Sequence, residues 1–255
     1  MTELKKALDF AVDIAHSAGQ ITLGYFQHEI DIELKNDNSP VTIADKKAEE
    51  FIRSKIEKQY PQAGILGEEF GESNENSSHK WIIDPIDGTK SFMRGVPLYS
   101  VLIALEIEGK VELGVSYFPA LNEMLFAARD QGAYFNGRRA YVSQVNELKK
   151  AVFAFTDVAN FNNFNRTKEW ELLKTNSYYR AGWGDAYGHA LVATGRVEAM
   201  FDPIMNPWDC GPFAIILKEA GGYFGNWSGQ ETIYGNEAMS INGGLLEPIL
   251  SLIND

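Results

Sequence analysis

The sequence has few of the residues on which several common kinds of site depend. Its 255 residues include one cysteine, Cys210, which excludes an internal disulfide and is typical of a protein of the reducing cytoplasm. We interpret Cys210 as a small buried helix residue rather than a nucleophile, because no basic partner lies near it in the sequence. The four histidines show no paired spacing, which argues against a His-based zinc site (His16, His28, His79 and His189).

Long apolar runs and the common nucleotide-binding motifs are also missing. No segment approaches the roughly 18–20 consecutive apolar residues of a membrane span. There is no GxxxxGK[ST], GxGxxG or GxSxG, and there is no internal repeat or low-complexity run. The amphipathic N-terminal pattern contains acids, so we expect neither a signal nor a transit peptide. These absences predict a cytoplasmic protein with no membrane partner.

Basic residues are in the minority. The chain has 23 Lys and Arg against 35 Asp and Glu, a formal charge of −12. Nucleic-acid and anionic-membrane binding need clustered Lys and Arg, so we expect neither partner. At first sight the same balance also disfavours an anionic small substrate. With 45% hydrophobic and 23% charged residues, the composition is that of an ordinary globular protein.

Hydrophobic periodicity predicts alternating helices and strands, hence a layered α/β or α+β fold. We predict a polar mobile loop at 71–78, an Asn136-Gly137 hairpin turn, and a first helix with Thr2 as its N-cap. A second helix carries apolar residues between 48 and 56 and stops before Tyr60-Pro61. Helices are also expected at 167–174, 186–194 and 212–220, and strands at 65–66, 81–83, 152–155 and 197–201, with three more between 99 and 128. The character of the chain changes near residue 145, which predicts two halves, residues 1–145 and 146–255.

Carboxylates sit at the ends of apolar runs in three places. Glu68 and Glu69 directly follow an apolar pair of strand length, and Asp84 and Asp87 follow the run WII. Asp209 stands where an Asn-Pro-Trp segment leads into a helix. A carboxylate at a strand end is held by a rigid element and points into loop space where ligands bind. Taken singly, each segment is better explained as a solvated loop acid or a helix N-cap.

Convergence of several acids requires a cation, because like charges raise each other's pKa and lose hydration. Oxygen ligands without Cys or His favour a hard ion, Mg²⁺ before Mn²⁺ or Ca²⁺, and the number of acids suggests more than one ion. Gly88-Thr89, at the start of a helical turn, presents backbone N–H groups that can bind phosphate. Metal carboxylates beside such a cradle predict a phosphoester site.

At these residues the sequence resembles the inositol monophosphatase family of Mg²⁺-dependent phosphatases. The resemblance covers nearly the whole chain, and its most specific segments are WIIDPIDGT, residues 81–89, and WD…EAGG, which begins at Trp208. It also includes Lys35, the SPVT segment at 39–42 and Asn136-Gly137. The resemblance implies the alternating α/β/α/β/α sandwich shared with fructose-1,6-bisphosphatase. The N-terminal half would carry most metal ligands, and the C-terminal half Asp209 and the specificity residues.

The resemblance also implies a ligand set. One Mg²⁺ would be held by Glu68, Asp84 and the main-chain oxygen of Ile86, and a second by Asp84, Asp87 and Asp209. A third, weaker ion is implied near Glu68, and Mn²⁺ is a possible substitute for Mg²⁺. A homodimer is implied as well.

The remaining implied roles concern phosphate and water. Gly88 and Thr89 would contact the phosphate group of the substrate. Thr89, linked to Asp45, would orient and deprotonate the attacking water, so the implied catalytic residues are Asp45, Thr89 and Glu68. Attack would proceed in line at phosphorus, with the two ions neutralising the phosphate and the leaving alkoxide.

Two departures from typical inositol phosphatases bear on the substrate. The chain has Lys90-Ser91 after DGT, and Asp185 and Tyr187 where small apolar residues are usual. These segments resemble the histidinol-phosphate phosphatase branch. Histidinol phosphate carries an ammonium and an imidazole, which extra carboxylates suit. We expect Asp185 to pair with the amine, and Asp87, Asp202 and Asp209 to contact the substrate too.

Several alternatives stay open. Asp185 is equally interpreted as the N-cap of the helix through Thr194. Other substrates within the superfamily are inositol 1-phosphate, for an enzyme of broad specificity, and 3′-phosphoadenosine 5′-phosphate. A non-catalytic homologue that binds protein or RNA is disfavoured because no ligand residue is lost. We interpret His189 as a surface or packing residue, and the segment 161–165 as a dimer contact or a pocket lid.

Overall fold

The structure, a computed structural model, describes residues 3–29, 32–34 and 40–254. Thr2, predicted as a helix cap, and Lys35 with residues 36–39 of the resemblance lie outside these ranges. The helices are α1 Glu3–Leu23, α2 Ile43–Gln59, α3 Thr89–Met93, α4 Val158–Asn163, α5 Thr167–Asn176, α6 Asp185–Ala193, α7 Pro207–Glu219 and α8 Leu246–Asn254, with short 3₁₀ turns at Pro119–Leu121 and Leu148–Lys150.

Two sheets come from separate parts of the chain. The larger has the order β10-β9-β8-β7-β6-β5-β3-β4 and is antiparallel except for the β3–β5 pair. Its strands are β3 Gly64–Gly67, β4 Gly71–Ser73, β5 His79–Asp87, β6 Ser100–Ile107, β7 Lys110–Phe118, β8 Glu123–Ala128, β9 Gly132–Phe135 and β10 Arg138–Arg139. The smaller has the order β12-β11-β13-β15-β14, from β11 Val152–Phe155, β12 Tyr179–Ala181, β13 Ala199–Asp202, β14 Gly222–Gly225 and β15 Ala238–Asn242. A separate ribbon pairs β1 Ile32–Leu34 with β2 Pro40–Thr42.

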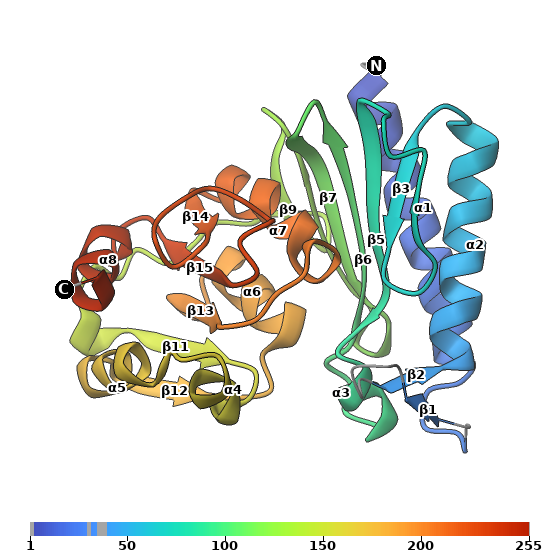
Figure 1. Ribbon diagram of the computed structural model, residues 1–255. Coiled ribbons are helices and arrows are strands. Elements are labelled where there is room, and N and C mark those ends of the chain that lie inside the picture. The colour runs from blue at the N-terminus through green and yellow to red at the C-terminus, as the bar shows by residue number, and fades with distance from the viewer. Residues whose placement is uncertain (1–2, 30–31, 35–39, 255) are drawn as a thin grey trace.

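The elements form five alternating layers (Figure 1). Helices α1 and α2 cover the outer face of the large sheet, and α6 and α7 lie between the two sheets. Helices α4, α5 and α8 cover the far side of the small sheet. This arrangement confirms the α/β/α/β/α sandwich. No helix in the described ranges is long and apolar enough to cross a membrane.

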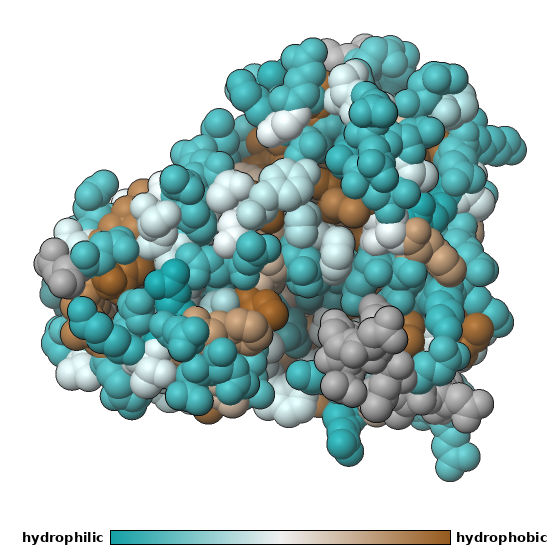
Figure 2. Space-filling model, viewed as in Figure 1, coloured by the Kyte–Doolittle hydropathy of each residue, from teal (hydrophilic) through white to brown (hydrophobic). Residues whose placement is uncertain are grey.

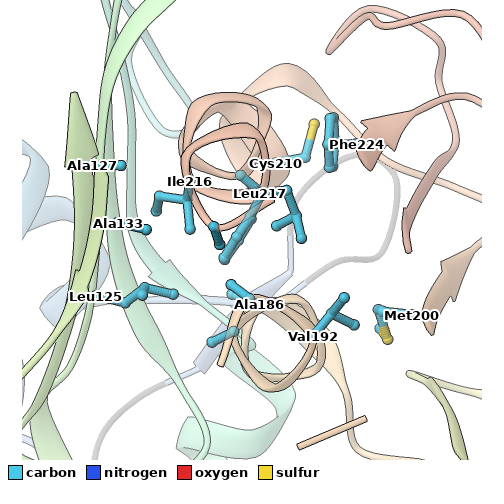
Figure 3. Packing of buried hydrophobic residues seen from close by; sticks show 14 of the residues in the cluster. Leu125, Ala127, Ala133, Ala186, Val192, Met200, Cys210, Ile216, Leu217 and Phe224 are labelled. Atoms are coloured by element: carbon cyan, nitrogen blue, oxygen red, sulfur yellow. The ribbon is translucent and has the colours of Figure 1, made fainter. Parts of the chain in front are cut away.

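The central layer joins the two sheets through one hydrophobic cluster (Figure 3). Leu125 and Ala133 of the large sheet face Ile216 and Leu217 of α7, and α6 packs below them toward Met200 of β13. Burying these side chains stabilises the fold by roughly 1.5–3 kcal/mol for each large aliphatic residue. The face shown in Figure 2 is mainly hydrophilic, with smaller apolar patches. Because the side chains of α6 and α7 pack against both sheets, this central layer holds the two sheets at a defined separation.

Three predicted boundaries need correction. Residues 71–73 are not loop but strand β4, because they pair in register with β3. The helix predicted from Pro212 begins five residues earlier, at Pro207, where proline suits the first turn. Pro212 lies inside α7. Strand β13 begins at Ala199, two residues later than predicted.

Candidate active site

Strand β5 carries two of the predicted metal ligands at its C-terminal end. Asp84 and Asp87 flank a register shift against β6, so the strand bulges where Pro85 removes a backbone donor. Asp84 is 1% exposed, and its Oδ1 accepts a 2.9 Å hydrogen bond from the N–H of Ile86. The bulge turns both carboxylates toward the same space. A local backbone device therefore brings together two acids that are three residues apart.

The third ligand comes from the other half of the chain, on the first turn of α7. Asp209 Oδ2 accepts hydrogen bonds from the backbone N–H of Asn206, at 2.8 Å, and from its side-chain amide, at 3.1 Å. An acid is favoured in the first turn of a helix, where free N–H groups and the helix dipole stabilise negative charge. Asp209 is thereby oriented toward β5.

Ligand oxygens of Asp84, Asp87 and Asp209 lie within 4.8 Å of one another. Burial raises the pKa of Asp84 and of Asp87 well above its usual range, and neighbouring carboxylates raise both further. Burial likewise raises the pKa of Asp209 to about 7. Three converging carboxylates, two of them buried and that of Asp209 partly buried, fit a hard divalent cation, which removes their mutual repulsion and supplies the missing counter-charge. Mg²⁺ fits this all-oxygen donor set.

Glu68 is placed by a helix residue that sequence reasoning missed. Glu49 of α2 is fully buried, and its carboxylate accepts the N–H groups of Glu69, at 2.8 Å, and Phe70, at 3.1 Å. Arg53 donates to the same carboxylate at 2.8 Å. A Cβ on Gly67 would lie 2.1 Å from Glu49 Oε1, so a larger residue there would displace the Glu49 carboxylate from these partners. Glu49 thus holds the β3–β4 turn on which Glu68 stands.

The residues after β5 have the geometry expected of an anion cradle. Gly88 has φ 80° and ψ 41°, a left-handed conformation that glycine adopts without strain. Thr89 begins α3, so backbone N–H groups are left free at its first turn. The Thr89 hydroxyl donates to the main-chain oxygen of Ile86 at 3.2 Å. That oxygen, also predicted as a metal ligand, therefore has a polar partner in this structure.

The predicted link between Thr89 and Asp45 is not formed. Asp45 lies at the third position of α2, where its Oδ2 accepts from the backbone N–H and hydroxyl of Thr42 in a capping box. Its buried Oδ1 has no hydrogen-bond partner, and burial raises the pKa of Asp45 to about 6. The capping box explains the absent link because it fixes the carboxylate toward Thr42. The unpartnered Oδ1 is available to a water or a cation.

Asp185 is not the N-cap of α6, which corrects one of the two interpretations. Its Oδ2 accepts from the Ser91 hydroxyl at 3.2 Å, and its own N–H donates to Thr156 Oγ1 at 2.9 Å. The N–H of Ala186, at the start of the helix, is bound instead by Asp87 Oδ2 at 2.8 Å. The metal-site acid therefore caps α6, which leaves Asp185 beside the anion cradle.

These groups surround one cavity of about 220 Å³. Seven of the ten predicted site residues line it: Glu68, Asp87, Gly88, Thr89, Asp185, Asp202 and Asp209. Of the other three, Asp84 belongs to the acid cluster, Ile86 is buried beside it, and the charge of Asp45 interacts with that of Glu68. Burial, followed by the charge of Asp202, raises the pKa of Asp185 to about 6.

Sequence reasoning missed several residues of the cavity wall. Thr156 follows strand β11 directly, so the rule that found the acids at strand ends could have found it. Asn160 of α4, Ile204 and Met205 also line the cavity, and no local pattern marks them. Lys90 is the one cationic side chain that lines the cavity in the described part of the chain.

Comparisons with known proteins agree with this geometry. A sequence model described as the inositol monophosphatase family matches residues 3–253. A protein named histidinol-phosphatase from Chlorobaculum parvum is 41% identical over 250 residues, which cover 97% of this chain and 96% of the relative. A protein named fructose-1,6-bisphosphatase/inositol-1-monophosphatase from Thermotoga maritima is 33% identical, with coverages of 97% and 96%.

Solved structures of similar proteins superpose along nearly the whole chain. An IMPase from Thermotoga maritima matches with a TM-score of 0.89 and 32% identity, covering 98% of this chain and 97% of its own. An inositol monophosphatase from Zymomonas mobilis matches with a TM-score of 0.90 and 27% identity over 100% of both chains. The fold around the acid cluster is thus shared with these phosphatases.

Proposed function

The chain belongs to the inositol monophosphatase family of phosphatases, and from that premise we propose that it is a Mg²⁺-dependent histidinol-phosphatase. The reaction is L-histidinol phosphate and water to L-histidinol and phosphate. Water oxygen bonds to phosphorus as the bond from phosphorus to the alkoxide oxygen breaks. The observation that carries the choice of substrate is that Asp185 and Asp202 line the same cavity as the metal-site acids.

Charge in the cavity supports a cationic substrate. Five acids line it, against Lys90 as the one described cation. Cations bound at the cluster would offset Glu68, Asp87 and Asp209, but Asp185 and Asp202 stand outside that set. An inositol ring offers hydroxyl groups, whereas an amino alcohol phosphate offers an ammonium that pairs with a carboxylate. The surplus negative charge therefore favours the amine.

Asp84, Asp87 and Asp209 would hold Mg²⁺, with Glu68 and the Ile86 carbonyl completing the set. When bound, Mg²⁺ supplies Lewis-acid chemistry that lowers the pKa of water and neutralises phosphate charge. The N–H groups at the start of α3, held open by Gly88, orient the phosphate.

Side chains of the protein orient the attacking water and accept its proton. The Thr89 hydroxyl lines the cavity and can accept a hydrogen bond from water while it donates to the carbonyl of Ile86. The unpartnered Oδ1 of Asp45 is the nearby acceptor that we assign to the proton, because desolvation favours the protonated carboxyl. These roles for Asp45 and Thr89 stand on the residues' positions and on the resemblance.

The test is a phosphatase panel. Purified protein is assayed with L-histidinol phosphate, myo-inositol 1-phosphate, fructose 1,6-bisphosphate and 3′-phosphoadenosine 5′-phosphate, with and without Mg²⁺. We expect Mg²⁺-dependent turnover that is at least tenfold more efficient with L-histidinol phosphate than with any other ester. Faster hydrolysis of inositol phosphate would refute the specificity and leave the phosphatase assignment standing.

A paired variant sharpens the test. Asp185→Asn should raise the KM for L-histidinol phosphate by about tenfold, the loss of roughly 1.4 kcal/mol of one ion pair. Asp130→Asn removes a charge from an exposed turn, where the side chain is 91% exposed, and serves as the matched control. Equal effects of the two substitutions would exclude the amine contact.

Cytoplasmic location and a homodimer stay proposals. Light scattering coupled to size-exclusion chromatography distinguishes a chain of 28.5 kDa from its dimer. A measured molar mass equal to that of a single chain, at the protein concentration of the assay, would refute the dimer.

A further inference from the structure

His189, which sequence reasoning interprets as a surface or packing residue, lies fully buried between three elements. Its Nε2 is 3.2 Å from Oδ2 of Asp202, at the end of β13. Its Nδ1 is 2.7 Å from Oγ of Ser240, on β15. The imidazole also stacks on Phe213 of α7, with ring centroids 5.0 Å apart and planes at 28°. A second ring, that of Phe224, lies 6.0 Å away, so two polar contacts and two ring contacts fix its orientation.

The partners determine which imidazole nitrogen carries the proton. A carboxylate can only accept, so the hydrogen bond to Asp202 requires a proton on Nε2. In the neutral ring Nδ1 is then an acceptor, and the Ser240 hydroxyl is its donor. Ser240 is fully buried, so water does not compete for this bond. Ser240 thus provides the hydrogen bond at Nδ1 that holds the ring in the orientation in which Nε2 donates to Asp202.

Asp202 is the functional end of this chain of contacts because it lines the active-site cavity. Its main-chain oxygen accepts from Trp227 Nε1 at 3.3 Å, which anchors the backbone. In the described part of the chain, only His189 donates to its carboxylate, through Oδ2. The other carboxylate oxygen has no donor there. One oxygen is held and the second is left for a ligand.

The imidazole, fixed by Ser240 and Phe213, donates to one oxygen of Asp202 and leaves the other without a donor among the described residues. We propose that His189, held in place by Ser240, is a positioning residue that orients the Asp202 carboxylate at the cavity and thereby selects phosphate esters that carry a cation. This inference rests on the proposed function and extends it to residues outside the cavity wall.

The experiment compares two esters that differ in one group. Ethanolamine phosphate carries an ammonium where the monophosphate of ethylene glycol carries a hydroxyl. The ratio of their kcat/KM values at saturating Mg²⁺ measures the preference for a cation, whatever the natural substrate is. We expect the unmodified protein to favour the ammonium ester.

His189→Phe keeps a ring against Phe213 and removes the donor. We expect it to reduce the preference for the ammonium ester at least fivefold through KM, with kcat for both esters within about threefold. His189→Gln, whose Nε2 can donate to Asp202, should restore most of the preference. Ser240→Ala should give an intermediate loss, because the ring then lacks the hydrogen bond at Nδ1 that fixes its orientation.

Three outcomes decide between the possibilities. A purely structural histidine would lower kcat/KM for both esters equally in His189→Phe and leave their ratio unchanged, which would overturn the inference. An unchanged ratio in a protein that hydrolyses L-histidinol phosphate would likewise overturn it while the proposed function stands. A ratio that falls as expected, in a protein that does not hydrolyse L-histidinol phosphate, supports the inference and refutes the proposed substrate.

Discussion

Glu49 lies outside the cavity, yet the structure predicts that it controls metal binding through Glu68. Glu49→Gln replaces one carboxylate oxygen with an NH₂ group, which cannot accept a hydrogen bond from a turn N–H group or from Arg53. Each hydrogen bond to a charged group contributes about 1.5–3 kcal/mol, so losing one and leaving a partly buried donor unpaired should cost about 2–4 kcal/mol of unfolding free energy.

The same change should loosen the turn that carries Glu68. Substituting a residue that orients a metal ligand typically weakens metal affinity by about 10–100-fold. We therefore expect the Mg²⁺ concentration at half-maximal activity to rise about tenfold or more. The assay is a Mg²⁺ titration of phosphatase activity, paired with urea unfolding. Glu50→Gln, at the exposed neighbouring position on α2, is the matched control. A less stable Glu49→Gln protein with an unchanged Mg²⁺ requirement would refute the reasoning.

Three further predictions concern the acid cluster and the cradle. Asp84→Asn should lower turnover by more than about 100-fold, which exceeds the effect of substituting a residue that only orients a metal ligand. It should also abolish thermal stabilisation by Mg²⁺ while the circular dichroism spectrum stays unchanged. Retained activity would contradict the metal site. Without metal, the raised pKa values of these carboxyl groups mean that the folded chain binds more protons than the unfolded chain. The melting temperature of the metal-free protein should therefore fall as pH rises from about 4 to 7, and Mg²⁺ should reverse this fall at pH 8. A metal-free protein that gains stability over this range would contradict the prediction. Gly88→Ala places a Cβ 3.1 Å from Asp185 Oδ2, whereas the Cβ of the matched control Gly109→Ala, at φ 77°, meets no atom within 4 Å. Both variants should lose about 1–2 kcal/mol of stability to the strain of a left-handed backbone. Only Gly88→Ala should also lose phosphatase activity.

Most helices and strands were predictable because their apolar periodicity is local. The hairpin turn at Asn136-Gly137 is confirmed, with positive φ at both residues, and β11 has the predicted bounds. The start of α7 was not predictable from Pro212, because a proline inside a helix resembles a proline at its first turn. Strand β4 escaped notice because its residues are polar, and only pairing with β3 makes them a strand.

The acids were predictable for a different reason. Asp84, Asp87 and Asp209 follow apolar runs, and strand ends and helix starts are where a fold can hold a charged group toward a ligand. A charge of −12 misled about an anionic substrate, because cations at the cluster would reverse the local field. Glu49 and His189 carried no such signal, since each acts through a partner that lies far away in the sequence.

The sequence by itself determined the layered fold class, the positions of the acids and the membership of a phosphatase family, because these depend on local pattern and on segments read in order. Only the tertiary structure decided which donors surround those acids. It showed that Asp87 rather than Asp185 caps α6, that Asp45 binds Thr42 rather than Thr89, and that His189 meets Asp202. Hydrogen bonds between distant segments depend on how the sheets and helices pack, and no local pattern records that packing.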